Sequence, residues 1–172
     1  RYLSLGIDKL NISIDSWNPV DHDSFRRKKG SHVHALQTLS LCKKLGMDVT
    51  ISVVVYKDYT KQSGFKDLVN FAIENKIRLA FKLSVPVGQW EGEIDNLATE
   101  NDKKTIYELH QKYPFLTRDI YGNSHNACPA FKDFFTITAY GDVLPCNSIH
   151  VSFGNLREES LISILNKSKK VK

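Results

Sequence analysis

The sequence predicts an α/β fold in its first 115 residues and a small cysteine-bearing β-hairpin in the remainder. Two observations predict the first part: short segments rich in β-branched residues alternate with amphipathic helical patterns, and the connections between them are short. A third observation predicts the second part, where two brief strand-like runs flank a glycine. We place the boundary between residues 115 and 116, within a transition that extends to residue 125.

The first predicted strand and helix occupy the first 46 residues. Apolar and polar residues alternate from Leu10 to Asp15, which predicts a strand with Ser13 and Asp15 on one face. Ser31 is a favourable N-cap for a helix of about four turns that Gly46 ends. The apolar stripe of this helix consists of Val33, Leu36, Leu39, Cys42 and Leu45.

Two more strands and one more helix follow. Val49 to Val55 and Ile77 to Leu83 are strand patterns, and Phe65 to Ile73 is the helical pattern between them. Strands separated in this way favour parallel pairing through right-handed crossovers. Three strands do not close a barrel, so they form either an open sheet or part of a larger barrel. The abrupt start of the sequence at Arg1 favours the second alternative.

A polar, acidic stretch from Gln89 to Asn101 is predicted to be a loop. Asn101 or Asp102 is expected to cap the helix that follows, and Pro114 marks the limit of this helix.

Two short runs, Phe134–Thr138 and Asp142–Leu144, predict a β-hairpin that turns at Gly141. Cys128 precedes this hairpin and Cys146 follows it. In hairpin geometry the two thiols can meet at one end of the ribbon, which suits a shared metal centre. Two thiolates do not fill four ligand positions, and the spacing alone fits a pair of buried hairpin thiols equally well.

The composition is that of an ordinary globular protein, with 41% hydrophobic and 25% charged residues. The net charge of +5 comes from scattered basic residues, so we expect no nucleic-acid partner. The basic run at residues 26–29 is either a solvated face or an attraction for an anion or acidic peptide. No apolar stretch or signal-peptide pattern points to a membrane, and we expect a cytoplasmic location.

Cys128, Gly141, Cys146 and Gly154-Asn155 follow one another in a recognisable order. This order resembles the start of the SPASM and twitch domains of radical S-adenosylmethionine (SAM) enzymes, in which a Cys, a spaced Gly, a second Cys, a Gly-Asn turn and a helix succeed each other. The resemblance implies that Cys128 and Cys146 are ligands of an auxiliary iron-sulfur cluster.

The segment Ile12-Ser13-Ile14-Asp15, followed by His22-Asp23-Ser24-Phe25-Arg26, is similar to the fourth barrel strand and following loop of the same enzymes. The resemblance implies that Ser13 and Arg26 lie near SAM, in contact with its ribose or its carboxylate. The planar guanidinium of an Arg can donate two parallel hydrogen bonds to a carboxylate, and a short hydroxyl side chain can hydrogen-bond to a ribose. Asp15 belongs to the same expected site, where it either orients Arg26 or ends its strand.

Three further candidates each have two interpretations. His22-Asp23 is either an acid–base pair or a pair that sets a turn or caps a helix. Cys42 lies on an apolar stripe, which favours a packed core thiol over a ligand. His150 is either a further ligand or a solvent-facing loop histidine, and the second is favoured.

The resemblance implies a partial β/α barrel of the radical SAM type at residues 1–115 and the start of a SPASM/twitch-like auxiliary-cluster domain at residues 116–172. The family's Cys-x3-Cys-x2-Cys loop, which binds the catalytic 4Fe-4S cluster, is absent from this sequence. We expect it upstream of Arg1, and we expect the chain as given to be inactive.

The complete enzyme is expected to generate a 5′-deoxyadenosyl radical from SAM and to modify a substrate with it. Peptide maturation is the first expectation for the substrate, and cofactor biosynthesis or enzyme maturation is the alternative. A flavodoxin or ferredoxin is the expected electron donor. Two other interpretations remain open at this point: a non-catalytic metal-binding module, and an ordinary α/β metabolic enzyme with buried thiols.

Overall fold

The structure is a computed structural model that describes residues 6–87, 90–116, 130–131 and 134–168. The chain divides into two compact units, Arg1–Asn123 and Ser124–Lys172. The boundary predicted after residue 115 stays a prediction, because the division falls among residues that the structure does not describe.

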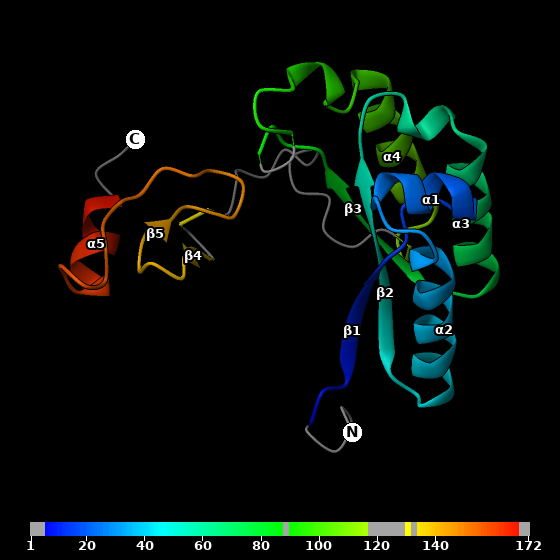
Figure 1. Ribbon diagram of the computed structural model, residues 1–172, viewed down its shortest axis with the longest axis horizontal. Coiled ribbons are helices and arrows are strands. Elements are labelled where there is room, and N and C mark those ends of the chain that lie inside the picture. The colour runs from blue at the N-terminus through cyan, green and yellow to red at the C-terminus, as the bar shows by residue number, and fades with distance from the viewer. Residues whose placement is uncertain (1–5, 88–89, 117–129, 132–133, 169–172) are drawn as a thin grey trace. The chain divides into compact units, whose positions relative to one another are not determined.

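Three parallel strands form the sheet of the first unit, in the order β1 (Lys9–Ser13), β2 (Asp48–Val55) and β3 (Arg78–Leu83), as Figure 1 shows. Ile12 of β1 lies beside Ile51 of β2, which in turn lies beside Leu79 of β3. The β-α-β-α-β order with parallel pairing confirms the prediction from sequence.

The connecting helices α2 (Ser31–Lys44) and α3 (Ser63–Glu74) lie on the same side of this sheet (Figure 1). Every second strand residue turns toward them, and these side chains form the core together with apolar residues of the two helices. The buried residues of this layer include Ile12, Ile14, Leu39, Val49, Ile51, Val53, Val55, Phe65, Leu68, Leu79 and Phe81.

The opposite face of the sheet is polar on β1 and in the first part of β2, and it also carries Ala80 of β3 and Val54 of β2. Asn11, Thr50 and Arg78 form one row across the three strands, and Ser13 and Ser52 stand side by side in the next row. Parallel strands usually carry apolar residues on both faces, since helices cover both. Alternation of this kind is expected where the second face lines the polar interior of a barrel.

The first strand ends at Ser13, two residues before the predicted end at Asp15. The N–H of Ile14 still donates to the carbonyl of Ser52 in β2, but the next N–H of β2 on this side, that of Val54, donates to the Asp15 carboxylate. A side chain therefore replaces the backbone carbonyl of β1 as hydrogen-bond partner, and pairing stops there.

Helix α1 (Pro19–Phe25) was not predicted from the sequence, which gave only the end of a strand at Asn18-Pro19. The Asn18 side chain accepts a hydrogen bond from the N–H of Val20, and Pro19 occupies the first helical position. Both features favour a helix start. This short helix carries the residues from His22 to Phe25, and Arg26 caps its C-terminal end.

The predicted N-cap of α2 is wrong by one residue. Gly30, with φ of 80°, is the N-cap, and Ser31 is the first helical residue. The cap interactions come from Asp23, whose carboxylate accepts hydrogen bonds from the N–H groups of Gly30 and His32 and from the Ser31 hydroxyl. The Asp23 carboxylate, which comes from another segment, thus makes the capping hydrogen bonds that were expected from the Ser31 hydroxyl.

Helix α4 (Glu100–Lys112) begins earlier than predicted. Thr99 is its N-cap, and the hydroxyl of Thr99 and the carboxylate of Asp102 form a reciprocal capping box. Asp102 also accepts hydrogen bonds from the N–H and hydroxyl of Thr60, which lies in the 3₁₀ turn η2 (Tyr59–Lys61). A second 3₁₀ turn, η4 (Ile94–Asn96), lies within the segment predicted to be a loop.

Only the middle of the predicted apolar stripe of α2 faces the core. Leu39 and Cys42 are 3% and 5% exposed, whereas Val33 and Leu45 are both 51% exposed. The prediction that Cys42 is a packed core thiol is confirmed.

The second unit contains an antiparallel pair of short strands, β4 (Thr136–Ile137) and β5 (Val143–Leu144), followed by helix α5 (Leu161–Ser168). Thr136 pairs with Leu144, and Ile137 pairs with Val143. The hairpin predicted around Gly141 is therefore confirmed, with shorter strands than expected.

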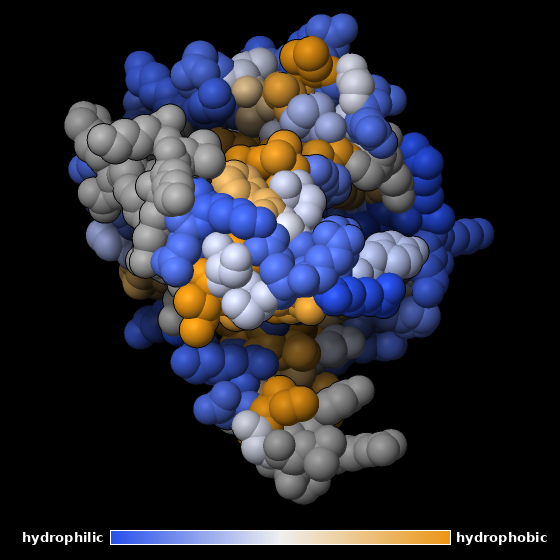
Figure 2. All heavy atoms as spheres, turned by 90° about the vertical axis from the view of Figure 1, so that its left-hand side faces the viewer, coloured by the Kyte–Doolittle hydropathy of each residue, from blue (hydrophilic) through white to orange (hydrophobic). Residues whose placement is uncertain are grey.

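Hydrophilic residues cover most of the face shown in Figure 2, and hydrophobic ones lie between them in small groups. Scattered apolar groups are ordinary on protein surfaces. Among the residues that the structure describes, no helix combines the length and apolar character that crossing a membrane requires.

Helix α2 offers a matched test of the core. Leu39→Ala is expected to lower the free energy of unfolding by about 2 to 5 kcal/mol, because it leaves a cavity at a buried position. Leu41, which is 57% exposed on the same helix, is the control, and its change to Ala should cost less than about 0.5 kcal/mol. Urea unfolding measures both. Equal losses for the two variants would contradict the orientation of α2.

Candidate functional site

The carboxylate of Asp15 lies at the carboxyl end of β1 and is the centre of a network of polar contacts. Asp15 is 2% exposed. Its Oδ2 accepts a hydrogen bond of 2.5 Å from Nε of Arg26, and its Oδ1 accepts one of 3.2 Å from the N–H of Val54 in β2. The buried charge is therefore both neutralised and hydrogen-bonded.

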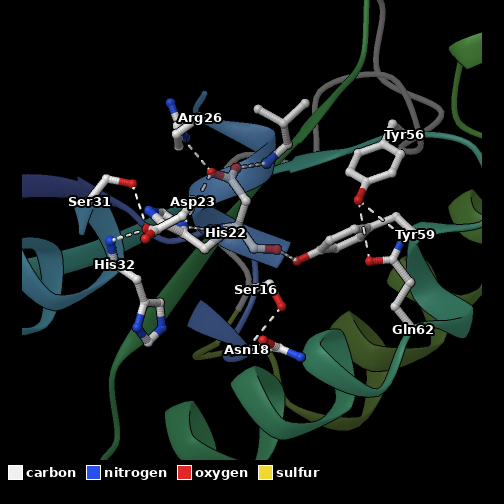
Figure 3. A network of polar contacts seen from close by, with 12 residues as sticks. Ser16, Asn18, His22, Asp23, Arg26, Ser31, His32, Tyr56, Tyr59 and Gln62 are labelled. Carbon is white, nitrogen blue, oxygen red and sulfur yellow. Dashed lines mark hydrogen bonds and ion pairs between the residues drawn. The ribbon is translucent and has the colours of Figure 1, made fainter. Parts of the chain in front are cut away.

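The backbone of Asp15 is held on both sides. Its N–H donates to Nδ1 of His22 at 3.1 Å, and its carbonyl accepts from the hydroxyl of Tyr59 at 2.5 Å. Figure 3 shows His22, Arg26 and Tyr59 approaching this network from different parts of the chain. Asp15 thus connects the end of β1 with α1, β2 and η2.

Arg26 follows α1, and its N–H donates to the carbonyl of His22 at 2.9 Å. Its side chain is 34% exposed, and Nε is the atom that Asp15 engages. Among the contacts of the described residues, neither Nη group of Arg26 has a hydrogen-bond partner. A guanidinium held by its Nε edge presents its outer Nη edge to a ligand, and this edge matches a carboxylate or phosphate.

Arg26 lies beside one ring of a cluster of three aromatic residues. Its guanidinium carbon is 5.7 Å from the ring centroid of Phe25. Phe25 is stacked on Tyr56 with centroids 5.3 Å apart, and Trp90 meets Phe25 edge-on at 5.8 Å. All three side chains are half-buried, so Arg26 adjoins, through Phe25, an aromatic wall that is partly open to ligands.

Burial lowers the pKa of His22 below its ordinary value of 6.5, although the neighbouring Asp15 carboxylate acts in the opposite direction. Because Nδ1 accepts from the Asp15 N–H, the neutral imidazole carries its proton on Nε2. His32, whose ring centroid lies 5.4 Å from that of His22, lowers the pKa of His22 further. His22 is therefore a neutral acceptor in this arrangement.

Burial also raises the pKa of Tyr59 well above its ordinary value of 10.0. The Tyr59 hydroxyl stays protonated over the usual range of pH and remains a donor to Asp15. Tyr56, the neighbouring tyrosine, instead exchanges hydrogen bonds with the side chain of Gln62 (Figure 3).

His22 and Asp23 do not act on each other as an acid–base pair. Asp23 turns to α2, where the hydrogen bond from the His32 N–H holds the pKa of Asp23 below its ordinary value of 3.8, although desolvation opposes it. The second interpretation of this dipeptide, a helix cap, is the one that the structure shows.

Of the three residues predicted to bind SAM, the structure brings two together. Asp15 orients Arg26, which was one of the two alternatives for Asp15. Ser13 lies on the polar face of β1, beside Ser52, and is exposed. Within the described contacts, Ser13 has no hydrogen bond to Asp15 or Arg26, and binding of SAM by these three residues stays a prediction.

The turn of the second unit requires a glycine. Gly141 has φ of +94°, and a Cβ at this position would lie 2.8 Å from Oδ1 of Asn155. The Asn155 side chain donates to the carbonyl of Tyr140 and to the carboxylate of Asp142, both at 3.1 Å. The Gly-Asn segment implied by the resemblance therefore packs directly on the hairpin turn and fixes its shape.

Cys146 follows β5 and is 9% exposed. Its Sγ accepts a hydrogen bond of 3.4 Å from the N–H of Ser148, a type of contact that cluster-ligating sulfurs also make. Cys128, the other predicted ligand, lies outside the described residues. His150 is exposed and its Nε2 lies 3.2 Å from the carbonyl of Asn147, as expected for a loop histidine.

In the part of the chain that the structure describes, no three His, Cys, Asp or Glu side chains lie close enough to hold one metal ion. A cluster bound at Cys146 therefore needs ligands outside the described residues, where Cys128 lies. The chemistry of Cys146, a buried sulfur with an N–H donor, fits the iron of such a cluster.

Sequence reasoning missed Tyr59, Tyr56 and Trp90. The Tyr59 hydroxyl reaches a carbonyl 44 positions earlier in the chain, and no local pattern reveals such a contact. A weak signal was present, since Tyr56 and Tyr59 directly follow a β-branched strand, where parallel sheets place their ligands.

Comparisons with known proteins agree with this architecture. Residues 128–172 match the SPASM family, an iron-sulfur cluster-binding domain. GTP 3',8-cyclase of Clostridium perfringens (strain 13 / Type A) is 30% identical over 86 residues, which are 49% of this chain and 25% of that protein. The crystal structure of Streptococcus suis SuiB bound to S-adenosylmethionine superposes with a TM-score of 0.53 at 20% identity and covers 91% of this chain.

These similarities confirm the resemblance to radical SAM enzymes with a SPASM-type domain. The similarity to SuiB also confirms the predicted fold class, a partial β/α barrel followed by a small auxiliary domain. The chain matches about a quarter of the length of the cyclase and 41% of SuiB.

The state of His22 can be measured by NMR. We expect its imidazole to titrate below its ordinary value of 6.5 and to carry the neutral-form proton on Nε2, because burial disfavours the charged ring and Nδ1 is an acceptor. Long-range ¹H–¹⁵N spectra report both properties, and His22→Asn identifies the resonance. A titration above the ordinary value, or an Nδ1-protonated ring, would contradict the described network.

Proposed function

We propose that this chain is part of a radical SAM enzyme in which Arg26 binds the carboxylate of SAM at the carboxyl end of the sheet. One observation carries this proposal: Asp15 engages only the Nε atom of Arg26 and leaves the Nη edge directed to a ligand. The site lies where parallel α/β sheets bind ligands. The similarity to SPASM-type radical SAM enzymes supports SAM as the ligand.

The neighbouring residues fit the remaining parts of SAM. Ser13 lies on the polar face of β1 and is exposed, so its hydroxyl is suited to a ribose. The wall of Phe25, Tyr56 and Trp90 offers planar apolar surfaces to an adenine or to an apolar group of the substrate. Asp15 contacts Arg26 and acts on SAM through it.

When bound to the catalytic cluster, SAM supplies the radical chemistry, while this chain orients the cofactor and excludes water. Cys128 and Cys146 are proposed ligands of an auxiliary iron-sulfur cluster in the second unit. The substrate class that we propose is a peptide, with a flavodoxin or ferredoxin as electron donor in the cytoplasm. The similarity to the radical SAM and SPASM group supports this choice.

The role of Arg26 is tested by SAM binding to the full-length protein. Arg26→Ala should weaken SAM affinity about tenfold or more, because a charge-assisted hydrogen bond is lost, and iron content should not change. Arg27→Ala is the matched control, since Arg27 is adjacent and exposed. Equilibrium dialysis with labelled SAM measures the affinity. An unchanged affinity for Arg26→Ala would remove Arg26 from the site.

The auxiliary cluster is tested by cysteine substitution. Cys128→Ser and Cys146→Ser should each lower the iron and acid-labile sulfide bound per chain, and they should reduce the visible absorbance of the anaerobically purified protein. Cys42→Ser is the control, because Cys42 lies in the core of the first unit. Zinc without sulfide in the unmodified protein would instead indicate a structural metal site.

A further inference from the structure

We propose that His22 and Tyr59 are positioning residues that fix Asp15 and, through Asp15, hold Arg26 in the orientation that binds the carboxylate of SAM. This role rests on the proposed function of Arg26. It assigns a task in the binding of SAM to two side chains that do not touch the cofactor.

Two side chains hold the backbone of Asp15 in position. Asp15 lies beyond the end of β1, so the strand ladder does not fix its backbone. Its N–H and its carbonyl instead bond to His22 of α1 and to Tyr59 of η2. Two side chains thus do for Asp15 what a neighbouring strand does for the residues before it.

Neither His22 nor Tyr59 is accessible to a ligand. His22 is 1% exposed and Tyr59 is fully buried. A ligand in front of the Arg26 guanidinium does not reach either ring, so any effect of these residues on binding passes through Asp15. The polar atoms of both side chains that are described, Nδ1 of His22 and the hydroxyl of Tyr59, bond to the Asp15 backbone.

The position of Asp15 determines that of the Arg26 side chain. The carboxylate of Asp15 is tied to Nε of Arg26 and to the N–H of Val54. A displacement of the Asp15 backbone would move Oδ2 away from Nε, and the long Arg26 side chain would regain its rotamer freedom. His22 restrains both partners at once, because its carbonyl also accepts the N–H of Arg26.

The His22 bond requires a free lone pair on Nδ1. Protonation of Nδ1 would place a donor opposite the Asp15 N–H and break this contact. The charged and titratable groups around His22 are Asp15 and Asp23, which favour the imidazolium, and His32 and Arg26, which disfavour it. SAM affinity should therefore fall as the pH drops through the range in which His22 becomes protonated.

The experiment measures the dissociation constant of SAM with full-length protein whose clusters are reconstituted. Tyr59→Phe removes only the hydroxyl, and His22→Gln removes the acceptor from the Nδ1 position. We expect each to weaken SAM binding about fivefold, the equivalent of one neutral hydrogen bond, without changing iron content. His22→Asn should restore most of the affinity, because its Oδ1 replaces Nδ1. Tyr107→Phe, an exposed site on α4, is the control.

Two further readouts separate positioning from a merely structural role. In an Arg26→Ala background, Tyr59→Phe and His22→Gln should cause no additional loss of SAM affinity, since they act through Arg26. The loss of affinity at low pH should also disappear in His22→Asn, which has no imidazole. Should His22→Gln fail to fold, Tyr59→Phe and its double variant carry the same test.

Three outcomes would overturn this role: unchanged SAM affinity in Tyr59→Phe and His22→Gln, losses that add fully to that of Arg26→Ala, or a pH profile that survives in His22→Asn. Each of these leaves the proposed function intact when Arg26→Ala alone weakens binding. Unchanged affinity in Arg26→Ala would overturn the proposed function and the positioning role together.

Discussion

The arrangement at the end of β1 depends on one physical constraint: the charge of Asp15 is buried and has to be neutralised and hydrogen-bonded where it lies. Arg26 and the Val54 N–H satisfy the carboxylate, and His22 and Tyr59 satisfy the backbone. Three other segments, α1 with its C-cap, β2 and η2, therefore meet at this one residue. Because both the carboxylate and the backbone of Asp15 are hydrogen-bonded, Asp15 is held in one position, which fixes the direction of the Arg26 guanidinium.

The two different faces of the sheet result from the alternation of side chains along its strands. Alternation along the strands gives an apolar face, against which α2 and α3 pack, and a polar face that includes Asn11, Ser13 and Thr50. The same alternation that builds the core thus provides the face on which we propose that SAM is bound. In this proposal, stability and binding use opposite faces of the same three strands.

The sequence predicted those features that local patterns determine. Alternating apolar residues located β2 and β3, apolar spacing located α2 and α3, and Gly141 located the hairpin. The predicted caps of α2 and α4 were less accurate, since Asp23 and Thr99 supply the cap interactions. Asp23 reaches the start of α2 from another segment, which a local pattern does not show, whereas the capping box of Thr99 and Asp102 is local to α4 and was overlooked.

The candidate site was predictable in part. Asp15 and Arg26 were named from a motif, and their ion pair agrees with one of the two roles considered for Asp15. The partners that hold Asp15 were not predicted, because the Tyr59 contact spans 44 positions and depends on the folded sheet. Tyr59 carried no motif signal, and His22 belonged to the motif but its contact with Asp15 is visible only in the folded structure.

The measurement that tests this account most directly is a crystal structure of the full-length protein with SAM bound. We expect the SAM carboxylate to accept hydrogen bonds from the Nη groups of Arg26, while Nε of Arg26 still donates to Asp15. A SAM carboxylate held by other residues, with Arg26 directed into solvent, would contradict the account.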